Sequence, residues 1–284
     1  MNYKNILVTG GAGFVGSALL SHLAKMKKYK LYSLDNYSSG TSKNHIDGVT
    51  YIGDKTSNIG DYMWIKPDIV FHFGEYSRVH TSLKDESIVH DYNILGTKAV
   101  IDYCVATGAR MIYSASSTKF GDKGENINKT PYAFYKSLNV QMIKNFHRWY
   151  DLDYTIIYFY NVYGPGQIEE GKYSTAIGIF ERQHRSGQPL TVCQPGDQKR
   201  DFTHIEDIIS GICLIMEKGC KSSYSLGTGK SYSILEIAKM FGDNIKMIPK
   251  RPGDRQDSLI DLNSMVDLGW KAKINIKDYI RSLK

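Results

Sequence analysis

The stretch VTGGAGFVGS, residues 8–17, decides how the rest of the chain must be arranged. It joins the apolar run NILVT, typical of a buried strand, to a pattern that predicts a helix over residues 14–27. Gly10, Gly13 and Gly16 lie three residues apart, so the backbone can turn tightly and approach a pyrophosphate resting on the helix N-terminus. A merely structural glycine turn would not need this spacing. The stretch therefore predicts a dinucleotide-binding site.

The identity of the dinucleotide depends on Asp35. This residue ends the next strand pattern, KLYSLD, 19 residues after Gly16. A carboxylate there can accept hydrogen bonds from the adenosine ribose hydroxyls, while it would repel a 2′-phosphate. The sequence therefore favours NAD over NADP as the cofactor.

Strand and helix patterns alternate through the first half of the chain. Further apolar runs are VTYIGD, DIVFHFG, RMIYSAS and YTIIYFY, and the longest helical patterns cover residues 84–107 and 132–150. Near-continuous apolar strands separated by helices predict an α/β fold with a doubly wound parallel sheet covered on both faces. Beyond residue 160 the elements become shorter. We therefore expect an NAD-binding domain over residues 1–160 and a substrate-binding lobe over residues 161–284, interleaved with the end of the sheet.

Composition and charge exclude several classes of protein. The net charge of +7 could indicate a protein that binds nucleic acid. However, residues 1–150 hold 18 Lys/Arg against 12 Asp/Glu, and residues 151–284 hold 18 against 17. The sequence shows no basic stripe interleaved with aromatic residues, which argues against nucleic-acid binding. No apolar run approaches the roughly 18 residues of a membrane span. The four cysteines show no metal-ligand spacing. We expect a cytoplasmic protein that has no metal and binds neither nucleic acid nor membrane.

The segment TPYAFYKS, residues 130–137, places Tyr132 four residues before Lys136, on one face of a predicted helix. Thr130 and Pro131 fit the start of that helix. A free tyrosine titrates near pH ~10, and a neighbouring ammonium would lower that value. Such a tyrosine could take a proton from a hydroxyl while a hydride leaves the same carbon. The spacing alone also arises by chance, so the pair needs support from other motifs.

That support comes from TGGAGFVG, LDNYSSG, YSASSTKFG, the Tyr132–Lys136 pair and YNVYGPGQ taken together. In combination they resemble the extended short-chain dehydrogenase/reductase family, and most closely its nucleotide-sugar epimerases, such as the UDP-galactose and UDP-N-acetylglucosamine 4-epimerases. The resemblance implies a Rossmann domain with a smaller C-terminal lobe. It also implies catalysis by Ser116, Tyr132 and Lys136, and a homodimer formed through the two long helices, where Val89, Ile94, Val100 and Ile101 would supply apolar surface.

The resemblance also implies which residues bind ligands. The implied cofactor contacts are Gly10, Gly13, Phe14, Val15, Gly16, Asp35, Asn36, Asp54, Phe73, Gly74, Asn93, Tyr132, Lys136 and Tyr160. The implied contacts with a nucleotide-diphosphate sugar are Ser116, Thr118, Asn161, Thr175, Val192, Arg200, Arg251, Asp254 and Ser258. Guanidinium groups suit the diphosphate because they can donate to its oxygens bidentately.

One position bears on the sugar, and two others depart from the family pattern. Ser258, four residues after Asp254, is small where related enzymes use residue size to admit or exclude an N-acetyl group, so UDP-N-acetylhexosamines should fit beside plain UDP-hexoses. Glu75 and Arg78 stand where most relatives have small or neutral residues. These two side chains either pair with each other, at i and i+3, or mark an unusual substrate.

The residues after Ser116 discriminate among related reactions. Related dehydratases use an Asp-Glu pair there and related decarboxylases keep the Glu, whereas this chain has Ser117 and Thr118. The resemblance therefore favours 4-epimerisation through a transient 4-keto sugar with NAD kept bound. The alternatives are a sugar-nucleotide dehydrogenase or reductase that releases its cofactor, and a non-catalytic dinucleotide sensor, which would be expected to lack Tyr132 or Lys136.

Overall fold

The central element of the molecule is a seven-stranded sheet, seen in a computed structural model that describes residues 3–257 and 262–283. Its strand order is β3-β2-β1-β4-β5-β6-β11, and every neighbouring pair is parallel. The strands are β1 (Asn5–Thr9), β2 (Lys30–Asp35), β3 (Val49–Gly53), β4 (Ile69–His72), β5 (Arg110–Ser116), β6 (Tyr154–Phe159) and β11 (Ser223–Leu226). The predicted doubly wound α/β fold is confirmed.

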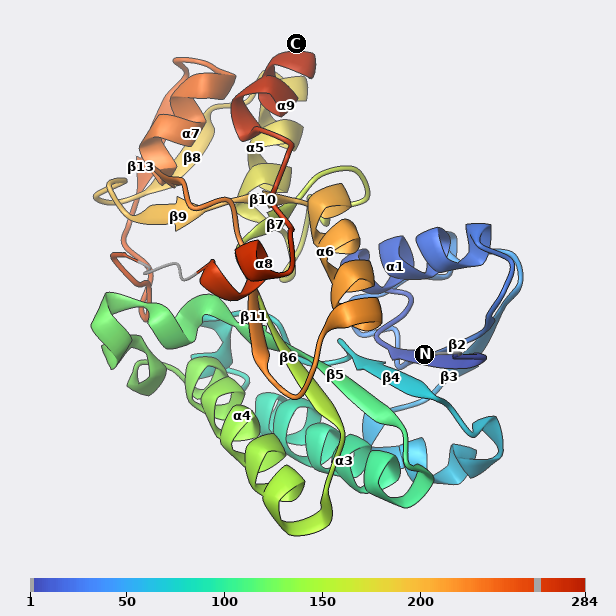
Figure 1. Cartoon of the computed structure of the whole chain (residues 1–284). Coiled ribbons are helices and arrows are strands. Elements are labelled where there is room, and N and C mark those ends of the chain that lie inside the picture. The colour runs from blue at the N-terminus through green and yellow to red at the C-terminus, as the bar shows by residue number, and fades with distance from the viewer. Residues whose placement is uncertain (1–2, 258–261, 284) are drawn as a thin grey trace.

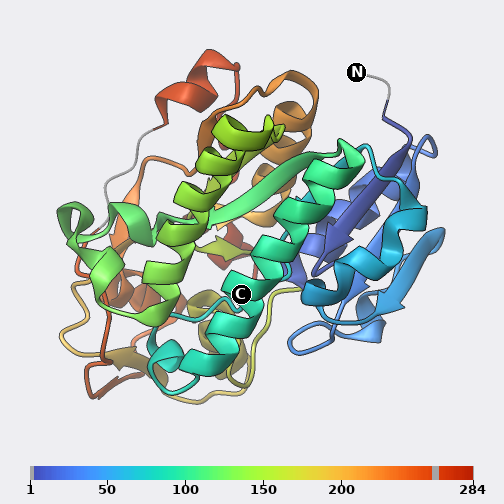
Figure 2. The same ribbon diagram turned by 90° about the horizontal axis from the view of Figure 1, so that it is seen from below.

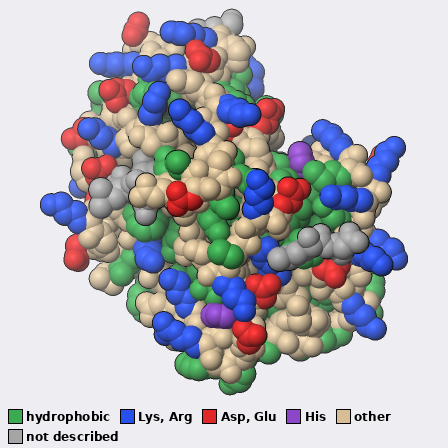
Figure 3. Space-filling view, viewed as in Figure 1, with side chains coloured by type: hydrophobic (Ala, Val, Ile, Leu, Met, Phe, Trp, Pro, Cys, Tyr) green, Lys and Arg blue, Asp and Glu red, His purple; other side chains and the backbone are tan. Residues whose placement is uncertain are grey.

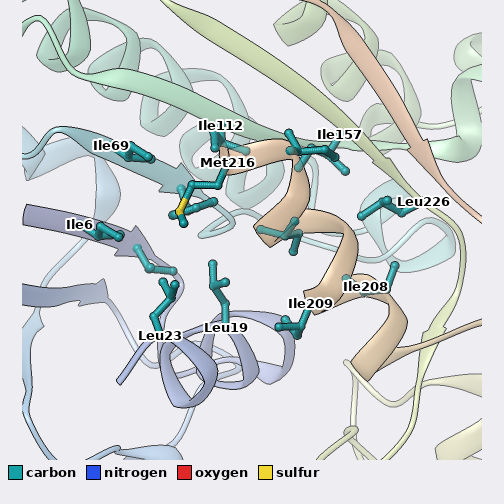
Figure 4. Packing of buried hydrophobic residues seen from close by; sticks show 14 of the residues in the cluster. Ile6, Leu19, Leu23, Ile69, Ile112, Ile157, Ile208, Ile209, Met216 and Leu226 are labelled. Carbon is teal, nitrogen blue, oxygen red and sulfur yellow. The ribbon is translucent and has the colours of Figure 1, made fainter. Parts of the chain in front are cut away.

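Helices cover both faces of this sheet (Figure 1). One face carries α1 (Phe14–Lys25) and α6 (Ile205–Lys218), and Figure 4 shows their apolar side chains meeting those of the strands. The other face carries α3 (Gly96–Thr107) and α4 (Pro131–Tyr150), which lie side by side in Figure 2. The helix predicted from residue 84 begins instead with α2 (Glu86–Val89) and continues through a π-helical turn, His90–Leu95, into α3.

Local sequence accounts for the ends of the helix that carries the Tyr-Lys pair. Thr130 is the N-cap of α4, its side chain accepting a hydrogen bond from the Ala133 N–H at 3.2 Å, and Pro131 follows at the first helical position. Asp151 ends the helix in the left-handed region, with φ of 52°. The start predicted from Thr130 and Pro131 is confirmed.

The second half of the chain builds a smaller lobe around its own apolar core. Three two-stranded sheets pair β7 with β10, β9 with β12 and β8 with β13. The elements of this lobe are β7 (Val162–Tyr163), α5 (Ala176–Arg185), β8 (Leu190–Cys193), β9 (Lys199–Asp201), β10 (Thr203–His204), β12 (Ser231–Ser233), α7 (Ile234–Phe241), β13 (Ile245–Ile248) and α9 (Ile276–Ser282). Helix α8 (Asn263–Asp267) belongs to the core of the main sheet instead, where Met265 is buried. Short 3-10 segments are Ser42–Asn44, Thr56–Ile65, His80–Leu83, Ser117–Phe120 and Asp122–Asn128.

The chain returns from this lobe to the main sheet. Strand β11 pairs with β6 at the sheet edge, and α6 packs beside α1 on one face (Figure 1). Residues beyond 160 therefore contribute to both parts of the molecule. The division at residue 160 stays a prediction, because the two halves share this sheet.

The surface shows no concentration of positive charge on the face drawn in Figure 3, where Lys and Arg side chains are interspersed with Asp and Glu. Within residues 3–257 and 262–283, no helix has the length and apolar character needed to cross a bilayer. In the same ranges, no group of three or more His, Cys, Asp or Glu side chains is placed to bind a metal ion.

Candidate active site

A cavity of about 600 Å³ opens where the carboxyl ends of β1, β2, β4 and β5 meet the smaller lobe. This is the position at which open α/β sheets bind ligands. The predicted cofactor residues that line it are Gly10, Gly13, Phe14, Val15, Gly16, Asp35, Asn36, Phe73, Gly74, Tyr132 and Lys136. The predicted sugar-nucleotide residues that line it are Ser116, Thr118, Asn161, Thr175, Arg200, Arg251 and Asp254.

The glycine-rich loop fits a dinucleotide. Gly10 has φ of +72°, and a Cβ there would come within 2.8 Å of the Gly74 backbone. A Cβ on Gly16 would lie 2.2 Å from the Gly10 carbonyl oxygen. Gly13 is the N-cap of α1, no side chain caps that helix, and no acidic residue occupies its first turn. The amide groups at this helix end can therefore face a pyrophosphate, which the helix dipole also attracts.

Asp35 is held at the edge of this loop. Its Oδ2 accepts a hydrogen bond from the Ala12 N–H at 2.9 Å, and its Oδ1 accepts one from the Tyr37 N–H at 2.8 Å. Burial raises the pKa of the Asp35 carboxyl, while these backbone donors lower it. Each carboxylate oxygen has further acceptor capacity, so the group can still accept from ribose hydroxyls.

The three predicted catalytic side chains come to this cavity from two elements. Ser116 ends β5, and Tyr132 and Lys136 lie one turn apart on α4. Ser116 Oγ accepts hydrogen bonds from the Thr118 N–H at 3.2 Å and the Thr118 hydroxyl at 3.0 Å. Tyr132 and Lys136 are both buried. The structure thus brings all three together, and their catalytic roles stay a prediction.

Glu75 does not pair with Arg78, which corrects one of the two interpretations offered above. Its Oε2 accepts a hydrogen bond from the Lys136 ammonium in a buried ion pair. Its Oε1 accepts hydrogen bonds from three further side chains, Thr97 at 3.0 Å, Asn139 at 3.0 Å and Tyr113 at 3.2 Å. Burial raises the pKa of the Glu75 carboxyl, while the Lys136 ammonium lowers it.

A buried histidine extends this hydrogen-bond network. Thr97 uses its only hydroxyl hydrogen on Glu75, so it must accept from His72 Nε2, 2.9 Å away. His72 Nδ1 is then the acceptor for the Thr9 hydroxyl at 2.8 Å. Burial lowers the pKa of His72 to about 3, and the Lys136 charge adds to that effect. The imidazole is therefore neutral.

Besides Arg251, two arginines line the cavity without an ion pair among the residues the structure describes. The Nε of Arg78 is buried and has no hydrogen-bond partner there. Both terminal nitrogens of Arg255 donate to Ser117 Oγ at 3.2 Å. Burial lowers the pKa of each guanidinium to about 10, so both remain charged at neutral pH.

Four predicted ligand contacts lie outside the cavity lining. Asp54 accepts hydrogen bonds from Asn58 and Tyr62 nearby, and Asn93 is fully buried, exchanging hydrogen bonds with the Tyr76 backbone. Tyr160 and Val192 are fully buried in the two apolar cores. These four side chains do not line the cavity in this structure, and their roles as contacts stay a prediction. The ninth substrate contact, Ser258, lies outside the described residues.

Sequence reasoning missed the ion pair of Glu75 and the position of Arg255. Glu75 and Lys136 are 61 residues apart, and no periodic pattern connects them. Arg255 directly follows Asp254 in the segment RPGDR. This neighbourhood with a predicted substrate contact could have identified Arg255 as a further candidate. The Ser117 hydroxyl that it binds stands at a position where related enzymes carry an acid.

The fold and cavity together define a dinucleotide-binding α/β protein with a lysine-tyrosine pair at the reacting end of its cleft. The family model described as "NAD dependent epimerase/dehydratase family" matches residues 6–227. The chain belongs to that family, and NAD is its cofactor.

Three known proteins illustrate the range of relatives. A UDP-glucuronic acid decarboxylase of Arabidopsis thaliana is 25% identical, covering 96% of this chain and 85% of the relative. The crystal structure of the Thermotoga maritima UDP-glucose 4-epimerase with UDP-glucose is 25% identical, with a TM-score of 0.91 over 98% of this chain and 96% of that one. The UDP-N-acetylglucosamine 4-epimerase of Methanobrevibacter ruminantium, in complex with UDP-N-acetylmuramic acid, is 27% identical, with a TM-score of 0.88 over 100% and 96%.

Proposed function

We propose that this protein is an NAD-dependent nucleotide-sugar 4-epimerase. Its substrate would be a UDP-linked six-carbon sugar, the class that includes the UDP-hexoses and UDP-N-acetylhexosamines expected from the sequence. The observation that carries the proposal is that Ser116, Tyr132 and Lys136 line one cavity with the glycine-rich loop, without a carboxylate at residues 117 and 118. Two of the similar solved structures are 4-epimerases, which supports the same reaction.

Ser116 and Tyr132 would handle the proton of the sugar hydroxyl. Ser116 Oγ accepts from the Thr118 amide and hydroxyl, so its own hydrogen is left to donate to the oxygen at C4. Tyr132 takes the hydroxyl proton when C4 is oxidised and returns it when C4 is reduced. When bound, NAD supplies the acceptor that takes a hydride and gives it back. Return to the opposite face of the 4-keto sugar gives the epimer.

Lys136 would act as a fixed group rather than a mobile cation. Its ammonium donates to Glu75 Oε2 and to the Ser114 carbonyl oxygen at 2.6 Å. An ammonium has three N–H bonds, so these partners leave one for a ligand or for Tyr132. Glu75 therefore holds the lysine in place and balances its charge in a buried site.

The placement of carboxylates argues against dehydration, which needs an acid or base beside the reacting carbon, and provides no acid at residues 117 and 118 to assist decarboxylation. Among the described residues that line the cavity, the carboxylates are Asp35, Glu75, Asp91 and Asp254. Asp35 lies at the cofactor loop, and Glu75 is fully engaged by its four donors. Asp91 pairs with Lys55 at 3.3 Å, and Asp254 with Arg200 at 3.4 Å.

The smaller lobe would hold the diphosphate. Arg200 and Arg251 line the cavity on this side, together with Asn161. Arg200 is buried and donates to the Lys199 carbonyl oxygen at 2.8 Å as well as contacting Asp254, so its guanidinium is already oriented. Oriented guanidinium groups are suited to bidentate donation to phosphate oxygens.

We further propose that the protein is a homodimer that pairs the helical face of α3 and α4 with its copy. The apolar residues first expected to form that face are mostly internal, since Val100 and Ile101 are fully buried against the sheet and Val89 is fully buried in a cluster with Tyr76 and Tyr132. Other apolar side chains of this helical face are exposed instead, namely Ile88, Leu95, Val105, Phe134, Leu138, Trp149 and Tyr150. Covering these side chains would remove a large apolar area from water.

The proposed reaction is tested by incubating the purified protein with UDP-, GDP- and dTDP-sugars and separating the products. A 4-epimerase gives a mixture of C4 epimers without net accumulation of reduced cofactor. Accumulation of reduced cofactor without an epimer would identify a dehydrogenase, and no change in any sugar while NAD binds would identify a non-catalytic NAD-binding protein.

A further inference from the structure

Arg78 presents an uncompensated positive charge inside the cavity. The loop after β4 carries its side chain into the lining, and the Nε atom is shielded from solvent without a partner among the described residues. Tyr132 and Lys136 line the same cavity. No carboxylate among the described residues pairs with it.

Three other cations of the cavity have acidic partners. Lys136 pairs with Glu75, Arg200 with Asp254 at 3.4 Å, and Lys172 with Asp85 at 2.6 Å. Arg255, by contrast, binds only the neutral hydroxyl of Ser117 in the described structure and also interacts electrostatically with Tyr132. Arg78 and Arg255, like Arg251 on the smaller lobe, therefore line the cavity without an ion pair among the described residues, and Tyr132 lines the same cavity.

Such an arrangement is costly in the free protein. The Arg78 side chain is only partly exposed, so its charge is incompletely hydrated and lacks a counter-ion among the described residues, and its shielded Nε has no hydrogen-bond partner there. A ligand that supplies a carboxylate would offset both, because a guanidinium donates to a carboxylate through two parallel hydrogen bonds. Arg200 and Arg251 on the smaller lobe are assigned to the diphosphate, whereas Arg78 belongs to the loop that also carries Glu75, the partner of Lys136.

We propose, building on the 4-epimerase function, that the sugar of the substrate carries a carboxylate and that Arg78 binds it. The substrate is then a nucleotide-linked hexuronic acid, with its carboxylate at C6 and the inverted carbon at C4. A guanidinium at the carboxylate also protects the intermediate. Oxidation at C4 makes a β-keto acid, whose C5–C6 bond breaks as the carboxylate loses its charge to leave as CO2. Stabilising the carboxylate anion keeps that bond intact while the hydride returns.

The test compares UDP-glucuronate with UDP-glucose in the NAD-loaded protein. The unaltered protein should turn over UDP-glucuronate with kcat/KM at least about 10-fold above that for UDP-glucose. Arg78→Met should lower the value for UDP-glucuronate by about 100-fold, as expected for a lost charge-assisted pair, and change that for UDP-glucose less than about 3-fold. Arg148→Gln, at an exposed position on α4 far from the lining residues, is the matched control and should change neither.

Several results would overturn the proposal or separate it from the reaction. A preference for UDP-glucose, or an equal loss for both sugars in Arg78→Met, would contradict a carboxylate site and leave 4-epimerisation standing. If no sugar is turned over, calorimetry still decides: tighter binding of UDP-glucuronate that Arg78→Met abolishes supports the site, and equal binding contradicts it. Release of CO2 with a UDP-pentose would support the carboxylate site and contradict the epimerase.

Discussion

Glu75 shows at the scale of one residue what the sequence could not reveal. Its departure from the family pattern was visible, but its partner was not, because the ion pair joins a loop after β4 to the middle of α4. The helical spacing predicted that Tyr132 and Lys136 share one face, and the family resemblance added Ser116 to the same site. Charge pairing between distant segments depends on the packing of whole elements and leaves no such signal.

The role of Tyr132 gives the first prediction at this scale. Tyr132→Phe should lower turnover by at least about 1,000-fold while leaving NAD binding and thermal stability nearly unchanged, because only the proton-transferring hydroxyl is removed. The matched control is Tyr135→Phe. The Tyr135 hydroxyl donates to Glu86 at the surface, so its removal should change turnover only slightly. Initial rates and calorimetry measure both effects. A loss in Tyr135→Phe with full activity in Tyr132→Phe would refute the assignment.

The buried ion pair gives the second prediction. Glu75→Gln leaves the Lys136 ammonium without its counter-ion and should lower the free energy of unfolding by about 3–5 kcal/mol. Glu86→Gln, at an exposed position on α2, should change it by less than about 0.5 kcal/mol. Urea denaturation compares these variants with the unaltered protein.

A double variant controls for other effects of the substitution. Combining Glu75→Gln with Lys136→Met removes both charges, so the loss should be smaller than the sum of the two single losses. Equal stability of Glu75→Gln and the unaltered protein would mean that the pair contributes nothing, contrary to its geometry.

At the scale of the elements, apolar periodicity was sufficient for the sheet and its helices. Six strands were predicted from runs that β1 to β6 match closely, because a strand buried on both faces must be apolar along its whole length. The dimer face was predicted less well. Val100 and Ile101 belong to the side of α3 that packs on the sheet, and a one-dimensional pattern does not separate that side from a second apolar side.

His72 links three elements and gives a prediction about pH. Its ring lies between Thr9 on β1 and Thr97 on α3, and its pKa in the folded state is lowered to about 3. Below pH ~6.5 His72 binds a proton in the unfolded chain but not in the folded protein, so the free energy of unfolding should fall as the pH drops. Between pH 6.5 and 4.5 the loss should be roughly 2–3 kcal/mol.

The control for this effect is a side chain that does not titrate. In His72→Gln, which is less stable throughout, the same change in pH should cost roughly 2 kcal/mol less than in the unaltered protein. Denaturation curves at several pH values measure the two slopes. Identical slopes would show that His72 is protonated in the folded state.

At the scale of the whole molecule, the exposed apolar residues of the α3–α4 face predict the assembly. Light scattering at micromolar concentration should give twice the 32.1 kDa mass of the chain. Leu138→Glu places a charge on this face, where a buried unpaired charge is costly, and should shift the mass toward the monomer. Val266→Glu, an equally apolar but exposed position on α8, is the control and should leave the dimer intact. A monomeric unaltered protein would contradict the homodimer.

The central claim is that a hydride leaves C4 and returns to the same carbon while the cofactor stays in the cavity. It is tested most directly with UDP-glucuronate and UDP-glucose that carry deuterium at C4, analysed by mass spectrometry and NMR after incubation with the NAD-loaded protein. The account predicts a C4 epimer that retains the deuterium at C4, with none in the solvent or in free reduced cofactor. Transfer of the deuterium to released cofactor, or its absence from C4 of the epimer, would contradict it.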